Sequence, residues 1–483
     1  MAPSTLHRLH PFPVCVLFAG PSLPRPQPTT RPRVINRIVA RPRILSERSE
    51  PSVNISIISG WLPLVVIGLA VVSLLAAIGW RSGHWRRQLV IGIPAAIVIP
   101  LGADVVLHAS GTFPDRFPVS AFVWGGVWVL AVVAAAVGWP KAARWIRVIS
   151  CVAVVLTAVV VGDALNTTYV RYPTIGRLVD LDTVNLVPNA QLQVIRDEVA
   201  KSGRLPSKGV VVTAHIPATV SKFNAHDAFV YLPPAWFATP PPELPTLILL
   251  PGEPGSSADW TQQGKADHIA DQFAAGHHGL APIIVMPDPN GFLTVDTECV
   301  NSSFGQAETY LVEDVPAFAR GTYDANEGPR SLAVAGLSAG GFCSVNLALR
   351  NPKVFPFFAN YSGLASPEYQ EDPRKDTIKI LFGGSNQSFQ NNNPIALLKK
   401  GSFPGMAGWL AVGKDDTRPL AAARRLQPAA ESAGIDTCLE VLPGGHDFGV
   451  WDQAFTDSLP WLSWKLGLTP QPAAGPATCT PGA

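Results

Sequence analysis

Residues 331–340 read Ser331-Leu332-Ala333-Val334-Ala335-Gly336-Leu337-Ser338-Ala339-Gly340 and join an apolar run to a segment of small residues that can continue as a helix. The Gly-x-Ser-x-Gly spacing is typical of a nucleophile elbow, a sharp strand-to-helix turn that exposes a serine hydroxyl at the carboxyl edge of a sheet. Alone this pattern occurs by chance. Here an apolar strand precedes it, a helix follows, and an acid and a histidine lie downstream. We therefore predict that Ser338 is the nucleophile of a serine hydrolase or acyltransferase.

Strands and helices are predicted to alternate on both sides of this turn. The predicted strands are 209–217, 227–232, 244–250, 282–286, 331–337, 357–361, 378–382, 408–412 and 437–442. The predicted helices are 260–274, 308–319, 339–350, 418–433 and 450–466. Buried strands alternating with helices indicate an α/β fold, with a mainly parallel sheet covered on both faces. We expect the α/β-hydrolase fold.

The predicted base and acid follow the serine in the chain order that this fold requires, which is serine, acid, histidine. His446 lies in a glycine-rich loop after the last predicted strand, where a loop can carry an imidazole over the sheet edge. Asp415 and Asp416 both directly follow the strand 408–412. A Gly-x-x-Asp turn favours Asp416 as the acid, and Asp415 is the alternative.

Two backbone amides are predicted to stabilise the oxyanion of the reaction. The Ala339 N–H lies at the start of a helix, where amides are free and the helix dipole helps. The second donor is expected in the loop after strand 244–250. Pro251 and Pro254 have no N–H, and so we predict the Glu253 N–H beside Gly252.

Four apolar runs precede this region, at 57–80, 88–110, 119–139 and 145–165, and each is long enough to cross a bilayer as a helix. The first and third loops carry the basic residues, which by the positive-inside rule places them in the cytoplasm. These residues are Arg81, Arg86, Arg87, Lys141, Arg144 and Arg147, whereas the second loop has only Asp115 and Arg116. The chain after the fourth helix is then extracytoplasmic.

Five segments are expected. They are a basic, proline-rich and disordered segment (1–52), four transmembrane helices (53–166), a linker (167–205), the catalytic domain (206–466) and a flexible tail (467–483). The arginines of the first segment would favour a cytoplasmic amino end, against the topology above. Our hypothesis is that translation starts near Val53, which a GTG codon could encode, and amino-terminal sequencing of the native protein would test it.

The net charge, the histidines and the cysteines of the chain bear on which partners, cofactors and disulfides we expect. The net charge of +2 on 483 residues gives no indication of a nucleic-acid partner. His277 and His278 have no third ligand at a familiar spacing, so we expect neither a metal site nor another cofactor. Cys299, Cys343, Cys438 and Cys479 lie in the outward half, where disulfides are permitted. Their connectivity is open, with Cys299–Cys343 as one candidate pair.

The outward half, from about 210 to 466, resembles the esterase D family of α/β hydrolases, which includes the antigen 85 mycolyltransferases. The resemblance rests on Leu249-Leu250-Pro251-Gly252, Asp259-Trp260, residues 336–341, Gly413-Lys414-Asp415-Asp416 and His446. The strings Asp296-Thr297-Glu298-Cys299 and Ala307-Glu308-Thr309-Tyr310 are similar to those of multi-spanning actinobacterial esterases. The resemblance implies Ser338 as nucleophile, Asp416 as acid and His446 as base. The family's usual His-Gly or Asp-Gly at the oxyanion loop is Pro251-Gly252 here.

These observations predict a membrane-anchored, extracytoplasmic serine esterase that acts on carboxylic esters through an acyl-enzyme. One alternative is a cell-envelope acyltransferase that moves an acyl chain to a sugar hydroxyl. The other is a non-catalytic binding protein on a hydrolase fold. The expected partners are an ester or acyl-lipid substrate, a glycan acceptor in the transfer reaction, and the lipid bilayer. Oligomeric state stays undetermined.

Overall fold

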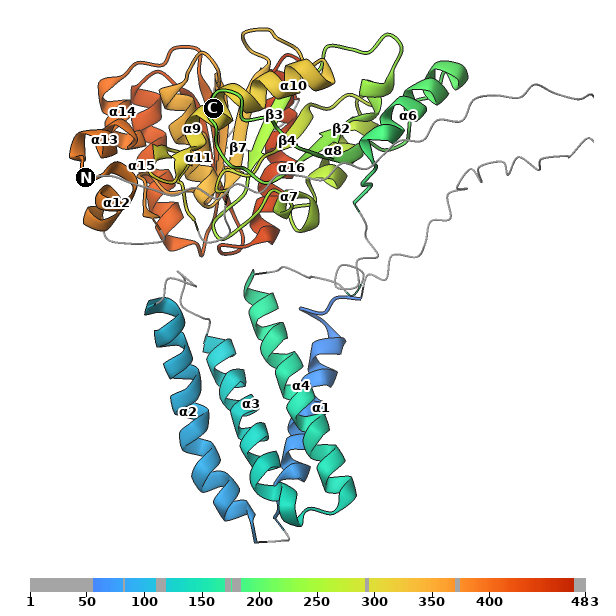
Figure 1. Cartoon of the computed structure of the whole chain (residues 1–483), viewed down its shortest axis with the longest axis vertical. Coiled ribbons are helices and arrows are strands. Elements are labelled where there is room, and N and C mark those ends of the chain that lie inside the picture. Colours follow the sequence, from blue (N-terminus) through green and yellow to red (C-terminus); the bar gives the residue numbers. More distant parts are fainter. Residues whose placement is uncertain are drawn as a thin grey trace, which may run out of the picture. The chain divides into compact units, whose positions relative to one another are not determined.

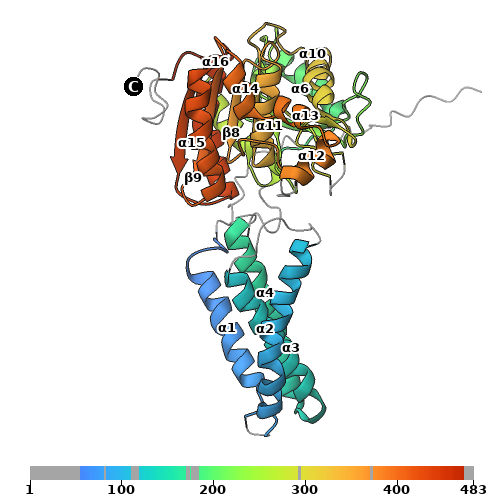
Figure 2. The same cartoon turned by 90° about the vertical axis from the view of Figure 1, so that its left-hand side faces the viewer.

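The structure is a computed structural model that describes residues 55–80, 83–109, 119–169, 175, 184–291, 295–369 and 374–472. The expectations for residues 1–52, for the second loop of the apolar half and for most of the tail lie outside these residues. Figures 1 and 2 show a group of four long helices in the amino-terminal half and a layered α/β domain in the carboxyl-terminal half.

The α/β domain is built on an eight-stranded sheet of order β1-β2-β4-β3-β7-β8-β9-β10. The pairs β1–β2 and β2–β4 are antiparallel, and all other neighbours are parallel. This arrangement confirms the predicted fold class. The strands are β1 (Val210–Ala214), β2 (Ala228–Leu232), β3 (Thr246–Leu250), β4 (Ile283–Met286), β7 (Leu332–Leu337), β8 (Phe357–Tyr361), β9 (Ala407–Gly413) and β10 (Asp436–Leu442).

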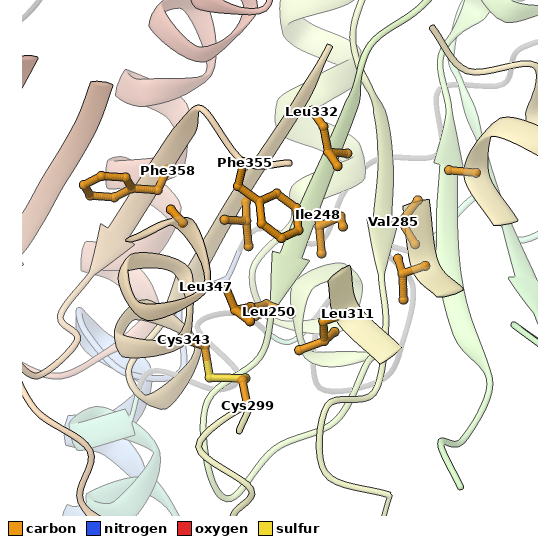
Figure 3. Close-up of a cluster of buried hydrophobic side chains, with 14 of the residues drawn as sticks. Ile248, Leu250, Val285, Cys299, Leu311, Leu332, Cys343, Leu347, Phe355 and Phe358 are labelled. Carbon is orange, nitrogen blue, oxygen red and sulfur yellow. A yellow bond between two sulfur atoms is a disulfide. The ribbon is translucent and has the colours of Figure 1, made fainter. Parts of the chain in front are cut away.

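Helices cover both faces of the sheet because the central strands are apolar on both sides, and every residue of β3, β7 and β8 is buried. One face carries α7 (Asp259–Gln262), α8 (Ala266–Ala275) and α16 (Phe448–Lys465). The other face carries α10 (Val315–Tyr323), α11 (Ala339–Arg350), α14 (Pro394–Lys400) and α15 (Thr417–Ser432). Figure 3 shows the core of this second face, where Ile248, Leu347 and Phe355 pack together.

The strand predicted at 378–382 is wrong, because this segment is the end of helix α12 (Arg374–Phe382). Its buried residues Thr377, Ile378, Leu381 and Phe382 recur at helical spacing. A short apolar run does not distinguish a strand from a buried helix, and here the helical spacing decides. The following helix α13 (Asn386–Asn391) was not predicted.

Two predicted helices depart from a regular α-helix. The helix at 260–274 breaks into α7 and α8, because Lys265 has a left-handed backbone with φ of 45°. The helix at 308–319 is continuous, but it consists of α9 (Ala307–Thr309), a π-turn at Tyr310–Asp314 and α10. Both side-chain oxygens of Asp314 accept hydrogen bonds from the β1–β2 loop, including one of 3.0 Å from the Ser221 N–H.

Part of the segment expected to be a linker packs on the α/β domain. It contains α6 (Asn189–Ser202), whose Val199 is buried in the core of the second face. Just before α6, Leu186 forms a parallel bridge with Val211 of β1. The packed domain therefore begins earlier than residue 206.

The amino-terminal helices are α1 (Trp61–Ala77), α2 (Trp85–Ala109), α3 (Val119–Gly138) and α4 (Arg144–Tyr169). Within the described residues, three of them are long and apolar enough to cross a membrane, at Trp85–Leu107, Val119–Gly138 and Arg144–Thr167. Helix α1 has 17 residues, or about 26 Å at 1.5 Å per residue, which is shorter than a typical hydrocarbon core. The buried Gln88 side chain donates a 2.8 Å hydrogen bond to the Ala134 carbonyl oxygen and so links α2 to α3.

A disulfide joins Cys299 to Cys343, the candidate pair named from the sequence (Figure 3). Cys343 lies in the first turns of α11, directly behind the predicted nucleophile elbow. Cys299 lies in the loop after β4. This bond therefore ties that loop to the helix that follows Ser338. Cys438 is also disulfide-bonded, whereas Cys151 is free.

Candidate active site

Ser338 occupies the turn between β7 and α11, as the Gly-x-Ser-x-Gly spacing predicts. Its φ of 54° and ψ of −120° are an unfavourable backbone conformation for a residue with a side chain. The turn is held because the Ser338 N–H donates a 2.8 Å hydrogen bond to the Tyr361 carbonyl oxygen of β8. A Cβ on Gly340 would collide with the Pro251 carbonyl oxygen, which explains the need for glycine there.

His446 and Asp416 lie within hydrogen-bonding distance of this serine in a continuous chain of contacts. His446 Nε2 is 2.8 Å from Ser338 Oγ, and His446 Nδ1 is 2.8 Å from Asp416 Oδ2. An ionised carboxylate only accepts hydrogen bonds, so the proton of the neutral imidazole belongs on Nδ1. Nε2 is then the acceptor for the serine hydroxyl, which is the geometry of a serine activated by a general base.

The acid and the histidine meet because β9 and β10 are parallel neighbours. Gly413 pairs with Leu442 at the ends of these strands, so both loops leave the sheet at the same edge. The loops are then joined by backbone hydrogen bonds from Lys414 N–H to the Leu442 oxygen (2.8 Å) and from Asp415 N–H to the Gly444 oxygen (2.9 Å).

The two candidate acids have different surroundings. The Asp416 side chain is 8% exposed and faces His446. The Asp415 side chain is 68% exposed, and its carboxylate lies 3.9 Å from the Lys414 ammonium group. The structure brings only Asp416 to the imidazole, so Asp415 is a solvated neighbour.

Two residues that support His446 were not identified from the sequence. Asp447 caps α16: its Oδ1 accepts the Val450 N–H at 3.1 Å, and its Oδ2 accepts the Gly445 N–H at 2.9 Å. Trp451 packs edge-on against the imidazole, with 4.9 Å between ring centroids. An acidic residue just before a helix is a recognisable capping signal, whereas no pattern indicates the tryptophan contact.

The predicted oxyanion donors belong to two segments, the start of α11 and the loop after β3. Ala339 is the first residue of α11, where backbone amides have no acceptor within the helix. Glu253 follows Gly252, which lies close to the serine, since a Cβ added to Gly252 would be 3.2 Å from Ser338 Cβ. The loop after β3 therefore brings Gly252, the residue before Glu253, against the nucleophile.

The Glu253 side chain is an unexpected feature of this loop. Its Oε2 accepts a 2.7 Å hydrogen bond from the Asn290 side chain, in the loop after β4. Burial, with the charges of Asp296, Asp288 and Asp259, raises the pKa of the Glu253 carboxyl group to about 9. At neutral pH this carboxyl group is protonated.

A second buried acid, Glu298, belongs to the same region. Its pKa is well above the ordinary value, because of burial and the nearby charges of Asp296 and Glu368. Its Oε1 accepts a hydrogen bond from the Glu368 N–H at 3.0 Å.

Within the described residues no group of three or more His, Cys, Asp or Glu side chains is arranged to hold a metal ion. His277 instead stacks on Phe273.

The family model described as "Putative esterase" matches residues 224–462, a range that contains all of the site residues described above. An uncharacterized protein of Corynebacterium glutamicum is 30% identical over 435 residues, which cover 86% of this chain and 98% of that protein. The similarity therefore includes the apolar helices as well as the α/β domain.

Two more distant similarities cover about half of the chain. An acetyl esterase of Caldicellulosiruptor saccharolyticus is 23% identical over 235 residues, covering 46% of this chain and 84% of that protein. The solved structure of a ferulic acid esterase has a TM-score of 0.47 and 23% identity, covering 54% of this chain and 99% of that one. The family match and the near full-length similarity to the Corynebacterium protein show that the chain belongs to the putative esterase family and is an α/β hydrolase of the esterase type.

Proposed function

We propose that this protein is a membrane-anchored, extracytoplasmic serine esterase that cleaves carboxylic esters through an acyl-enzyme on Ser338. The observation that carries the proposal is the contact chain Ser338–His446–Asp416, with two successive hydrogen bonds of 2.8 Å. A serine hydroxyl is a weak nucleophile at neutral pH, and this chain provides the base and the group that orients it.

In the proposed reaction Ser338 Oγ attacks the ester carbonyl carbon while His446 Nε2 takes the hydroxyl proton. The Asp416 carboxylate accepts a hydrogen bond from the Nδ1–H group and stabilises the imidazolium. The Ala339 and Glu253 backbone amides donate to the oxyanion. When the tetrahedral intermediate collapses, His446 returns the proton to the departing alcohol. Water then attacks the acyl-enzyme, again with His446 as base, and releases the acid.

Hydrolysis and acyl transfer differ only in the second nucleophile, which is water in one case and a sugar hydroxyl in the other. We favour hydrolysis because the family is described as esterases and one relative is an acetyl esterase. Ser338 and His446 are also partly exposed, and this gives water access to the acyl-enzyme.

The proposed location follows from the apolar helices and the charge of their loops. Helices α2, α3 and α4 are the long spans. Basic residues at the amino ends of α2 and α4 favour an orientation in which both amino ends lie in the cytoplasm. The α/β domain follows α4 and is then outside the cytoplasm, whether or not α1 crosses the bilayer. The Cys299–Cys343 disulfide supports an oxidising compartment.

The enzymatic proposal is tested with the full-length chain in detergent and p-nitrophenyl esters of increasing acyl length. We expect turnover by the wild type and a loss of at least 10³-fold in Ser338→Ala. Ser432→Ala, at an exposed serine at the end of α15, is the matched control and should behave as wild type. An inactive wild type that is correctly folded would favour a non-catalytic binding protein. Products acylated on an added sugar in preference to water would favour the acyltransferase.

The location is tested by adding protease to spheroplasts that carry the full-length protein with a carboxyl-terminal tag. We expect digestion of the tagged domain without lysis of the cells. Protection until the membrane is disrupted would contradict the extracytoplasmic orientation, and it would leave the esterase assignment untouched.

A further inference from the structure

The Glu253 side chain is oriented by a rigid neighbour. Asn290 is buried, with 7% of its surface exposed, and its own side-chain oxygen accepts the Thr297 N–H at 3.2 Å. Because a backbone N–H can only donate, the amide oxygen of Asn290 faces Thr297 and its NH2 group faces Glu253. The 2.7 Å contact to Glu253 therefore has a fixed direction, with Oε2 as the acceptor.

This direction leaves the other carboxyl oxygen of Glu253 for a different partner. Among the described residues no group forms a hydrogen bond with Oε1. Oε1 is also absent from the set of fully buried polar atoms that lack a partner, so it is accessible from outside the protein. Glu253 is partly exposed and follows the glycine that lies against Ser338. An accessible polar atom is thus held in a fixed orientation on the residue that follows the glycine lying against Ser338.

The charges around Glu253 determine whether its carboxyl group presents a hydrogen-bond donor or an acceptor to a substrate. Asp259, Asp288 and Asp296 face it from α7 and from the loop after β4, and the buried Glu298 lies close enough to interact with it. No positive side chain is among the groups that shift its titration. Since Oε2 accepts from Asn290, a proton on this carboxyl group resides on Oε1, which then acts as a hydrogen-bond donor. The same surroundings disfavour an anionic substrate group by like-charge repulsion.

We propose that Glu253 is a specificity-determining residue, and that its Oε1, oriented by Asn290, hydrogen-bonds a hydroxyl oxygen of an uncharged, sugar-like ester. The inference rests on the proposed esterase function, because it assigns the kind of substrate that the same serine would attack. It concerns the Glu253 side chain and is separate from the oxyanion role of its backbone amide. A hydroxyl group suits the position because it can both accept from a protonated carboxyl group and donate to an ionised one.

The test compares two acetyl esters of primary alcohols that differ mainly in their hydroxyl groups, methyl 6-O-acetylglucopyranoside and cyclohexylmethyl acetate. The quantity measured is the ratio of kcat/KM for the sugar ester to that for the cyclohexyl ester. Full-length wild type, Glu253→Gln and Glu253→Leu are assayed in detergent, and labelling by a fluorophosphonate verifies that each variant is folded. Glutamine keeps one acceptor toward Asn290 and presents one donor outward, as the neutral acid does.

We expect the wild type to prefer the sugar ester, the ratio to fall about tenfold or more in Glu253→Leu, and Glu253→Gln to retain most of the preference. A wild-type ratio near one, or equal ratios in wild type and Glu253→Leu, would overturn the proposal. If neither ester nor p-nitrophenyl acetate is cleaved, the esterase function itself fails, and Glu253 is not the cause.

Discussion

On one side of Ser338 the Asp416 carboxylate faces an imidazole nitrogen at 2.8 Å, and the loop that carries it is hydrogen-bonded to the histidine loop. On the other side the Glu253 carboxyl group lies among three aspartates and is raised in pKa to about 9. Asp416 has a partner, His446, that stabilises a negative charge on its carboxylate. Glu253 has acidic neighbours that disfavour a negative charge on its carboxyl group. The same functional group thus serves as an ion on one side and as a neutral hydrogen-bonding group on the other, because only the surroundings differ.

The largest effect is expected on the charged side. Asp416→Asn keeps the size of the side chain but no longer fixes the imidazole proton on Nδ1, so kcat should fall about 10⁴-fold. Asp415→Asn is the matched control, since its side chain is 68% exposed and does not reach the histidine. Steady-state kinetics of the two variants check the assignment, and an equal loss in both would break the distinction between these neighbouring acids.

A smaller loss is expected when the oxyanion loop is displaced. A Cβ at Gly252 would lie 2.9 Å from Leu337 Cδ1 and 3.2 Å from Ser338 Cβ, so we expect Gly252→Ala to shift the contact between this loop and the nucleophile by a few tenths of an ångström. We expect kcat to decrease about 10²-fold, as for loss of one oxyanion donor. Gly276→Ala provides the control, because an added Cβ there meets only an ordinary contact at 3.6 Å. Unchanged kcat in Gly252→Ala would mean that this loop does not form part of the site.

Removing the Cys299–Cys343 disulfide tests how much the link between the loop after β4 and α11 stabilises the protein. The bond closes a loop with a sequence separation of 44, which in the chain-entropy model corresponds to about 4 kcal/mol of stability. We expect Cys343→Ser to lower the temperature at which fluorophosphonate labelling is half lost by about 10 °C. Cys151→Ser removes a free cysteine and should leave that temperature unchanged. Equal midpoints in the two variants would show that the tether adds no stability.

The smallest effect concerns a buried acid away from the nucleophile. Burial and the nearby Asp457 raise the pKa of Glu440 to about 8, and its Oε2 accepts a 3.2 Å hydrogen bond from the Trp409 indole. Its folded-state pKa lies above the ordinary value of 4.5, so its contribution to stability is present at low pH and is lost as the pH rises through 8. Glu440→Gln should therefore reduce the drop in thermal midpoint between pH 6 and pH 9 by a few degrees. An identical drop in both proteins would show that Glu440 titrates normally.

The same comparison explains which features the sequence could predict. The proximity of Ser338, Asp416 and His446 could be predicted because each follows a strand in a fixed order, and the parallel pairing of β9 with β10 brings two of them together. The proposed role of the Glu253 side chain depends on acids from α7 and from the loop after β4, whose convergence no local pattern indicates.

Errors in the predicted elements have a similar origin. Helix α12 was predicted as a strand because a segment of five residues, four of them apolar, is too short to reveal its period. Helix α6 was assigned to a linker because a polar sequence with a single buried valine gives little sign of packing. In both cases the neighbouring elements, which supply the buried surface, decide the outcome.

The central claim is that Ser338 is the nucleophile, and it is tested most directly by identifying the residue that a fluorophosphonate modifies. The full-length protein would be labelled in detergent, digested and analysed by peptide mass spectrometry. We predict a single phosphonylated serine, Ser338, no labelling in Ser338→Ala, and strongly reduced labelling in His446→Ala, which lacks the base. Labelling of another serine, or undiminished labelling in Ser338→Ala, would contradict this account of the active site.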